Sequence, residues 1–221
     1  MQSAKLYEKY LIAWNIFMSI SYSLRSLCIY ALLSLLTACD SPSSPPIEPE
    51  IPKIAGAEMV LSSAGVGPIN IKTAFNIHQI TLAFDEHRYN VEQIQKYRED
   101  GSKNYPIIRV SKNTDTLLMI TPNKSQRRIF SVLITDNRVG NALGHTLGME
   151  YGAIYAYGHT EQCMLGQDNF AGKVLCYAPQ SGNIIYLFGD SQTQNAMYEK
   201  LPPIDALDSW KLESIIWKPK K

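Results

Sequence analysis

The sequence predicts a mainly β protein, an antiparallel β-sandwich-like domain with two short helices. The chain has 221 residues, 45% hydrophobic and 19% charged, which is enough for one domain with its own core. Short runs rich in β-branched or aromatic residues recur along it and end in turn residues, as antiparallel strands do. Only two segments show helical spacing instead. The predicted strands are AEMVLSS, YPIIRVS, TLLMITP, RIFSVLIT, GKVLCYA, NIIYLFG and LESIIWK.

The N-terminal segment, residues 1–38, is predicted to be a signal peptide. The apolar run Leu27–Ala38 follows Arg25 and has 12 residues, the length of a signal-peptide core and too short for a membrane span. The segment LTAC, Leu36–Cys39, resembles the lipobox of bacterial lipoproteins. In that class the cysteine thiol receives a diacylglyceryl group and the chain is cut just before it. We therefore expect lipidation at Cys39.

Residues 39–53, CDSPSSPPIEPEIPK, are predicted to be a flexible Pro/Ser tether, and residues 54–221 the β-rich globular domain. Two or more acyl chains anchor a protein stably, so we expect a bacterial envelope protein held at the inner or outer membrane and facing the periplasm. The chain starts either at Met1 or at Met18. The alternatives are an uncleaved transmembrane anchor over Leu11–Ala38 and a buried Cys39 in an internal helix.

Removal of the leader leaves Cys163 and Cys176 as a pair besides the lipidated cysteine. An oxidising envelope compartment favours a disulfide between them. Metal ligation is the alternative, although no nearby cysteine or spaced histidine completes a tetrahedral set.

The first helical segment is TAFNIHQITLAF. Ile77, Ile80 and Phe84 recur in it at helical spacing, and Thr73 is the expected N-cap. The second helical segment is GMEYGAIYAYG. There, Tyr151, Ile154 and Tyr155 share one face.

Gly158 is the expected stop of this second helix.

The order of elements predicts an internal β-α-β-β duplication, with chance similarity as the alternative. VLSSAGVGPINIKTAF aligns without a gap with LITDNRVGNALGHTLG, and PIIRVSKNTDTLLMITP aligns with KVLCYAPQSGNIIYLFG. Each half then consists of a strand, a glycine turn, a short helix and a hairpin. RIFSVLIT is expected to close the first half and open the second.

Five stretches resemble the RpoE-regulated lipoproteins of gammaproteobacteria, an uncharacterised envelope family named for its control by the envelope-stress sigma factor. They are GPINIKTAFNIHQITLAF, YNVEQ, GHTLGMEYGAIYAYG, GKVLCYAPQSGNIIYLF and LESIIWKPK, within residues 67–220. The resemblance implies a mostly β, sandwich-like domain on a lipid anchor and a link to envelope stress. It implies no functional residue beyond the lipid site.

Candidate chemistry is sparse in this sequence. His145, His159 and Glu161 could form a metal site, but no HExxH pairing supports one, and surface or capping roles are the alternative. His87 is expected in solvent and His78 half-buried beside apolar neighbours. The remaining candidates lack the motif that their chemistry needs: Ser62, Ser63 and Ser181 as nucleophiles, Gly65–Gly67 as a phosphate loop, and Asp205 with Asp208 as an acid and base.

The charge balance indicates neither nucleic acid nor an anionic membrane surface as a partner. Without the leader the chain has 18 basic and 19 acidic residues, a net charge of −1. Lys124, Arg127 and Arg128 form the only basic cluster along the sequence, and we expect a solvated loop there. Tyrosines crowd the second half, where they form either a binding face or the edge of the core. They are Tyr151, Tyr155, Tyr157, Tyr177 and Tyr186.

The sequence as a whole predicts a lipid-anchored envelope protein with a non-catalytic structural or binding role. We expect no catalytic residues, no cofactor and no metal ligands. The membrane is the expected partner through the anchor, with an envelope protein or peptidoglycan as a further partner. The alternatives are an envelope enzyme, such as a metal-dependent hydrolase, and a peptidoglycan- or protein-binding module.

Overall fold

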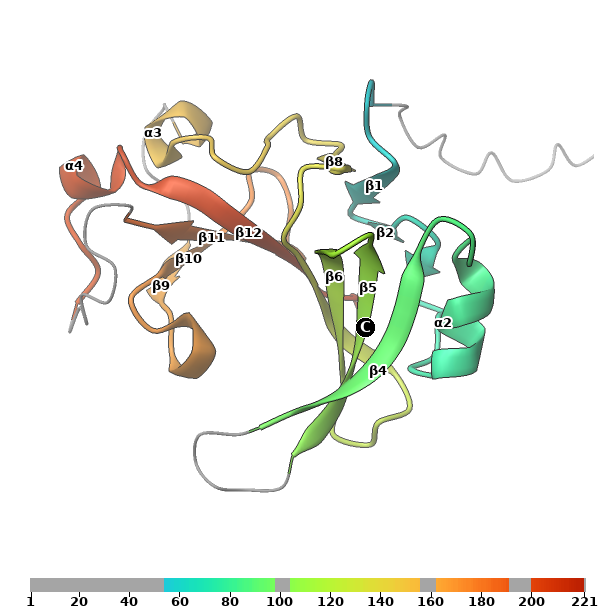
Figure 1. Ribbon diagram of the computed structural model, residues 1–221. Helices are drawn as coiled ribbons and strands as arrows, with labels where there is room; N and C mark the ends of the chain where they lie inside the picture. Colours follow the sequence, from blue (N-terminus) through green and yellow to red (C-terminus); the bar gives the residue numbers. More distant parts are fainter. Residues whose placement is uncertain (1–53, 98–103, 156–161, 191–199, 221) are drawn as a thin grey trace, which may run out of the picture. The chain divides into compact units, whose positions relative to one another are not determined.

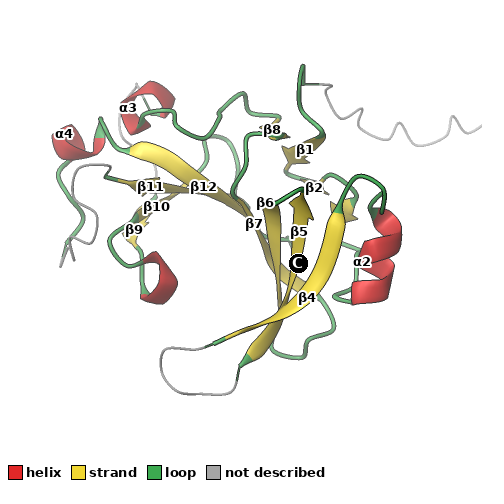
Figure 2. Cartoon of the chain, in the orientation of Figure 1, coloured by secondary structure: helices red, strands yellow, loops and turns green. Residues whose placement is uncertain are grey.

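Two β-sheets make up the fold in the computed structural model, which describes residues 54–97, 104–155, 162–190 and 200–220 (Figures 1 and 2). The larger sheet has eight strands in the order β4-β5-β6-β7-β12-β11-β10-β9. Its strands are β4 (Asn90–Lys96), β5 (Tyr105–Lys112), β6 (Asp115–Pro122), β7 (Ile129–Ile134), β9 (Cys163–Leu165), β10 (Val174–Tyr177), β11 (Ile184–Gly189) and β12 (Lys211–Trp217). The smaller sheet has the order β3-β2-β1-β8. Its strands are β1 (Met59–Ser62), β2 (Gly65–Val66), β3 (Ile69–Asn70) and β8 (Val139–Asn141).

All neighbouring strands of the larger sheet run antiparallel, which confirms the predicted mainly β, antiparallel class. Strands β4 to β7 form one meander and β9 to β12 form a second, and the two meanders meet where β7 pairs with β12. The exception to antiparallel pairing lies in the smaller sheet, where β1 runs parallel to β8 with Met59 opposite Val139. These two strands open the two halves of the chain, so their pairing joins the halves a second time.

The element order repeats as the aligned segments predict. Each half has a short strand (β1 or β8), then an α-helix (α2 or α3), then a four-stranded meander. One detail of the prediction was wrong: RIFSVLIT, which contains β7, closes the first half but does not open the second, because β8 takes that position beside β1. The duplication itself stays a prediction.

The two faces of the larger sheet are buried to different extents. On β11, Ile184, Tyr186 and Phe188 point into the main hydrophobic cluster, while Ile185 and Leu187 point to a small cluster on the opposite face. The smaller sheet adds residues to the main cluster, which makes the arrangement sandwich-like. Every residue of both clusters lies between Met59 and Trp217, so the domain contains its own core. Each large apolar side chain in it stabilises the fold by about 1.5–3 kcal/mol.

Helix α2 (Ile77–Ala83) begins at a cap other than the predicted one. Asn76 is the N-cap, and its Oδ1 accepts a hydrogen bond from the backbone N–H of Gln79 at 3.0 Å. Thr73 instead accepts from the N–H of Asn70 at 3.0 Å, within the turn that precedes the helix. The predicted apolar face is confirmed, since Ile80 and Phe84 are buried and Ile77 packs against the main cluster.

Helix α3 (Tyr151–Ile154) also presents the predicted face. Tyr151, Ile154 and Tyr155 are all buried in the main cluster, while Gly158, the predicted stop, lies outside the described residues. Two further short elements go beyond the two predicted helices: the 3-10 helix η1 (Asp168–Phe170) and α4 (Ile204–Leu207). Within the residues that the structure covers, no helix is both long and apolar enough to cross a membrane.

The structure contains the disulfide between Cys163 and Cys176. The two cysteines lie opposite each other on β9 and β10, and Cys176 is fully buried. The bridge therefore fastens the three-residue strand β9 to the sheet.

We expect reduction of this disulfide to lower the free energy of unfolding by about 3 kcal/mol, because the bridged cysteines are 13 residues apart and the open loop gains conformational entropy. Urea unfolding with and without dithiothreitol measures the difference. The Cys163→Ser/Cys176→Ser double variant is the control, and dithiothreitol should leave its midpoint unchanged. Equal midpoints for the wild-type protein in both conditions would contradict a role of the disulfide in stability.

Candidate functional site

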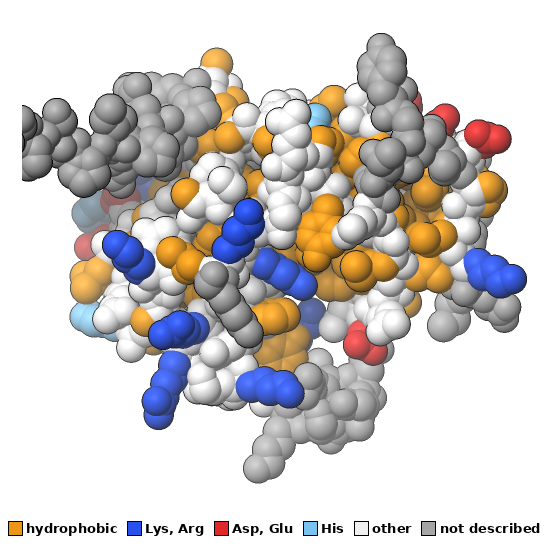
Figure 3. All heavy atoms as spheres, turned by 180° about the vertical axis from the view of Figure 1, so that it is seen from behind, with side chains coloured by type: hydrophobic (Ala, Val, Ile, Leu, Met, Phe, Trp, Pro, Cys, Tyr) orange, Lys and Arg blue, Asp and Glu red, His pale blue; other side chains and the backbone are white. Residues whose placement is uncertain are grey.

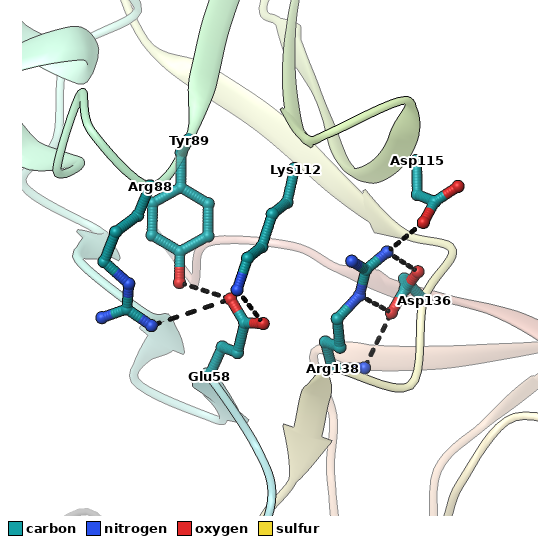
Figure 4. A network of polar contacts seen from close by, with 7 residues as sticks. All are labelled: Glu58, Arg88, Tyr89, Lys112, Asp115, Asp136 and Arg138. Carbon is teal, nitrogen blue, oxygen red and sulfur yellow. Dashed lines mark hydrogen bonds and ion pairs between the residues drawn. The ribbon is translucent and has the colours of Figure 1, made fainter.

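Glu58 lies one residue before β1 and holds three partners around its carboxylate (Figure 4). Its Oε1 accepts from Lys112 Nζ at 2.5 Å and its Oε2 accepts from Tyr89 OH at 3.0 Å. An Arg88 guanidinium nitrogen lies 3.8 Å from Oε2, and the Glu58 side chain is only 15% exposed. The hydrogen bond from Lys112 is the main cause that lowers the pKa of Glu58. Burial, followed by the bond to Glu58, raises the pKa of Tyr89.

A second charged group lies beside it and is joined to it through the backbone. The N–H of Glu58 donates to the carbonyl of Arg138 at 2.8 Å. The Arg138 guanidinium donates two bonds to Asp136, at 2.8 and 2.6 Å, and one to Asp115 at 2.8 Å (Figure 4). These bonds lower the pKa of Asp136 and raise the pKa of Arg138.

Together these groups form what we call the entry cluster, since it surrounds the first strand of the domain. Its charged members, three cationic and three anionic, cancel one another. They are Glu58, Arg88, Lys112, Asp115, Asp136 and Arg138. A carboxylate held ionised by close cations is a poor general acid or base near neutral pH, because its pKa lies far below the operating pH. The cluster is therefore suited to holding β1 in place.

A second polar group lies inside the domain, where Tyr186 on β11 contacts Asn141 on β8 and His145. Asn141 Oδ1 accepts from the N–H of Leu143 at 3.0 Å, so the amide nitrogen faces Tyr186 and donates to its hydroxyl at 2.8 Å. The same hydroxyl lies 2.8 Å from His145 Nδ1. Tyr186 donates this bond when His145 carries its own proton on Nε2, the neutral tautomer that leaves Nδ1 free to accept.

Burial shifts both ionisable groups of this trio toward their neutral forms. It raises the pKa of Tyr186 to about 12 and lowers the pKa of His145. A Tyr–Asn–His group with these protonation states forms a closed set of hydrogen bonds between β8 and β11. Sequence reasoning named Tyr186 and His145 but missed Asn141, the buried residue that orients the tyrosine.

Three of the five tyrosines of the second half belong to the core, which was the alternative to a binding face. Tyr151, Tyr155 and Tyr186 are all buried. The Tyr155 hydroxyl donates to the carbonyl of Tyr177 at 2.7 Å, and burial raises the pKa of Tyr155. Tyr177 is half-buried, and Tyr157 lies outside the described residues.

Of the three candidate metal ligands that the sequence analysis considered, only His145 lies within the described residues. His159 and Glu161 lie outside the described residues, and His145 uses Nδ1 for Tyr186. No three His, Cys, Asp or Glu side chains converge on a metal-sized position in residues 54–97, 104–155, 162–190 and 200–220. His87 is exposed as expected. The half-buried position expected for His78 was wrong, because this residue of α2 points into solvent.

The predicted lipid site, Cys39, lies outside the described residues. The serines that were considered as nucleophiles serve the fold. The Ser63 carbonyl accepts from Asn183 Nδ2 at 2.8 Å and from Trp217 Nε1 at 3.2 Å. Ser62 Oγ accepts from the N–H of Ala64 at 3.2 Å. Ser181 Oγ hydrogen-bonds Asn183 Oδ1 at 3.2 Å.

GVG is not a loop, because Gly65 and Val66 form strand β2 and only Gly67 lies in the turn that follows. A Cβ at Gly65 would lie 2.0 Å from the carbonyl oxygen of Ile69. Asp205 lies in the first turn of α4, and both it and Asp208 are exposed.

Glu58→Gln is expected to lower the free energy of unfolding by about 1–2 kcal/mol at pH 7, because two cations then face an uncharged amide. The loss should shrink as the pH falls below the ordinary value near 4.5, since the stability from a lowered carboxyl pKa is present only while the carboxylate is ionised. Glu92→Gln is the matched control. Its ion pair with Arg109 is more exposed, so a loss under 1 kcal/mol is expected from urea unfolding. Equal losses for the two variants would contradict a special role of Glu58.

Tyr186→Phe is expected to cost about 1–3 kcal/mol, because it leaves the buried Asn141 amide without its acceptor. Tyr97→Phe, at a side chain 77% exposed, should cost under 0.5 kcal/mol in the same thermal or urea melts. The lowered pKa of His145 adds a pH signature. Stability of the wild-type protein should fall as the pH drops below the ordinary histidine value of 6.5, and His145→Gln should reduce that slope. A slope unchanged by His145→Gln would show that this residue is not the titrating group.

Comparison with known proteins adds a family and a fold. Curated protein sequences include no match to this chain. A crystal structure of the uncharacterized protein yfeY from Escherichia coli matches with a TM-score of 0.57 and 22% sequence identity, over 72% of this chain and 98% of that one. At that identity the likeness shows a shared fold alone. The family described as "Protein of unknown function (DUF1131)" matches residues 52–219, nearly the whole of the β-rich domain. The chain therefore belongs to the DUF1131 family.

Proposed function

We propose that this protein is a lipid-anchored protein of the bacterial envelope, facing the periplasm, whose β-rich domain serves a non-catalytic structural or binding role linked to envelope stress. The link to envelope stress rests on the resemblance of residues 67–220 to the RpoE-regulated lipoproteins. The anchor rests on the LTAC segment and the Pro/Ser stretch that follows it. The partner that such a role requires is an envelope protein or peptidoglycan.

The observation that carries the non-catalytic role is the mutual satisfaction of the polar groups. The entry cluster is neutral, and Tyr186, Asn141 and His145 bond one another. Among the described residues no buried side-chain nitrogen or oxygen lacks a hydrogen-bond partner. Catalytic groups need free lone pairs or protons aimed at a substrate. Here the strongest polar contacts are directed at the protein itself.

The position of the entry cluster fits a tethered domain. Glu58 lies five residues after the end of the predicted tether, and its three side-chain partners come from the β4 and β5 region of the larger sheet. The start of β1 is thus fixed to the larger sheet by charge-assisted bonds. A domain held by its N-terminal end benefits from such a fixed point.

The Cys39→Ser variant is expected to lose the anchor. Intact mass spectrometry of the wild-type protein from its native host should give residues 39–221 plus a diacylglyceryl group and a further acyl chain, and the protein should fractionate with membranes. Cys28→Ser, a change within the predicted leader, is the matched control and should give the same mature mass as the wild type.

A free thiol at Cys39, or a leader still attached in the mature protein, would overturn the anchor. Metal analysis of the native protein tests the enzyme alternative. Stoichiometric zinc, together with substrate turnover lost in a His145 variant, would contradict the non-catalytic role.

A further inference from the structure

Three segments of the domain contain basic residues and no acidic ones. No Asp or Glu occurs between Glu58 and Asp85, between Asp115 and Asp136, or after Glu213. The described cations of these segments are Lys72, Lys124, Arg127, Arg128, Lys218 and Lys220. Along the sequence they are spread over 149 positions, in one group of three, one pair and the single Lys72.

The strand pairing brings these segments to one end of the larger sheet. Trp217 of β12 lies opposite Val132 of β7, so the chain after Trp217 runs beside the start of β7 and the turn before it. Lys218 Nζ lies 5.2 Å from the centre of the Phe130 ring. The segment around Lys72 joins the same end.

That connection runs through the backbone. The N–H of Phe75 donates to the carbonyl of Arg127 at 3.1 Å, and Ala74 forms a β-bridge with Arg128. The turn itself is fixed by Asn123, whose N–H donates to the Arg128 carbonyl at 2.9 Å. We call the six cations, together with Phe130, the basic end.

The cations of the basic end carry uncompensated charge. None of the six forms an ion pair with an acidic residue of the described chain, whereas the cations of the entry cluster are all paired. Five of them are exposed and Lys218 is half-buried. Phe130 between them is 52% exposed, and Ile71, next to Lys72, is also 52% exposed.

The basic end borders a small apolar cluster on the same face of the sheet, whose central residues are only 1–6% exposed. Lys218 directly follows the end of β12 and lies two positions after Ile216, so both side chains are expected on the face opposite the main core. Ile216 packs there with Ile185 and Leu187, bordered by the partly buried Leu133. Figure 3 shows Lys and Arg side chains gathered on the left and lower left of this face, with hydrophobic side chains among them and to their right.

We propose that the basic end binds the anionic phospholipid headgroups of the membrane that carries the anchor. This inference rests on the proposed lipid anchoring. Clustered Lys and Arg attract anionic lipid, and an adjacent aromatic side chain inserts at the level of the headgroups. The predicted tether supplies proximity. Residues 40–53 span at most about 50 Å when fully extended, so the domain stays close to the bilayer at a high effective concentration.

The test uses the predicted mature chain, residues 39–221 carrying Cys39→Ser, so that no acyl chain contributes to binding. Its sedimentation is measured with vesicles of phosphatidylethanolamine alone and with vesicles that also contain phosphatidylglycerol. We expect binding only to the phosphatidylglycerol vesicles, weakened by salt. Each cation near an anionic surface contributes about fivefold in affinity, so Arg127→Gln/Arg128→Gln/Lys218→Gln should bind at least tenfold more weakly.

Two further variants serve as tests of position and of the aromatic ring. One removes the same charge from elsewhere on the domain, and the other removes the Phe130 ring. Arg109→Gln/Lys173→Gln/Lys211→Gln removes the same amount of charge from ion-paired positions and should bind within about twofold of the unmodified chain. Phe130→Ser should weaken binding about threefold or more, because the inserted ring is lost. Urea unfolding of every variant verifies that the fold is intact.

The proposal is overturned by vesicle binding that is absent, independent of phosphatidylglycerol, or equal in both triple variants. It is also overturned if a soluble polyanion such as single-stranded DNA binds as tightly as the vesicles. Every protein in this assay carries Cys39→Ser, so its result is independent of the mass measurement on the native protein. Failure of the basic end and failure of the anchor can therefore be told apart.

Discussion

The antiparallel pairing of β7 with β12 is the interaction on which the rest of the structure depends. It joins two meanders that are otherwise linked through the short parallel pair β1 and β8. Its register places Ile215 opposite Ile134 and Trp217 opposite Val132, all four in the main core. A slip of one residue would turn Ile215 and Trp217 to the opposite face. The same register sets the C-terminal lysines beside the β6–β7 turn, so core packing and surface charge share one cause.

Much of the fold could be predicted because its signals are local. Runs of β-branched and aromatic residues predicted β1, β5, β6, β7, β10, β11 and β12, but not the short β2, β3, β8 and β9 or the polar β4. The spacing of Ile80 and Phe84 predicted the buried face of α2. The N-cap was wrong because Thr73 and Asn76 are both good caps, and the choice depended on which of them the preceding turn used. His78 is exposed because it lies two positions before the buried Ile80, on the other side of the helix.

The polar groups could be predicted only in part, because they depend on contacts between distant segments. Asn141 and Tyr186 are 45 residues apart, and Glu58 and Lys112 are 54 apart. No local sequence pattern predicts a hydrogen bond between residues so far apart in the chain. The basic cluster of the sequence, Arg127 with its neighbours, looked too small to form more than a solvated loop. In the structure this cluster is part of a larger basic surface, because the pairing of β12 with β7 places the C-terminal lysines beside it.

The two edge strands of the larger sheet affect whether copies of the protein can pair through their sheets. An open edge of paired strands can recruit another chain through its unused backbone groups. At one edge β9 has only three residues and is covalently tied to its neighbour, so it offers little template. At the other edge β4 alternates charged and amide side chains, with Glu92, Gln93, Gln95 and Lys96 along its length. Edges of this kind disfavour sheet-to-sheet aggregation wherever copies of the protein meet at high concentration.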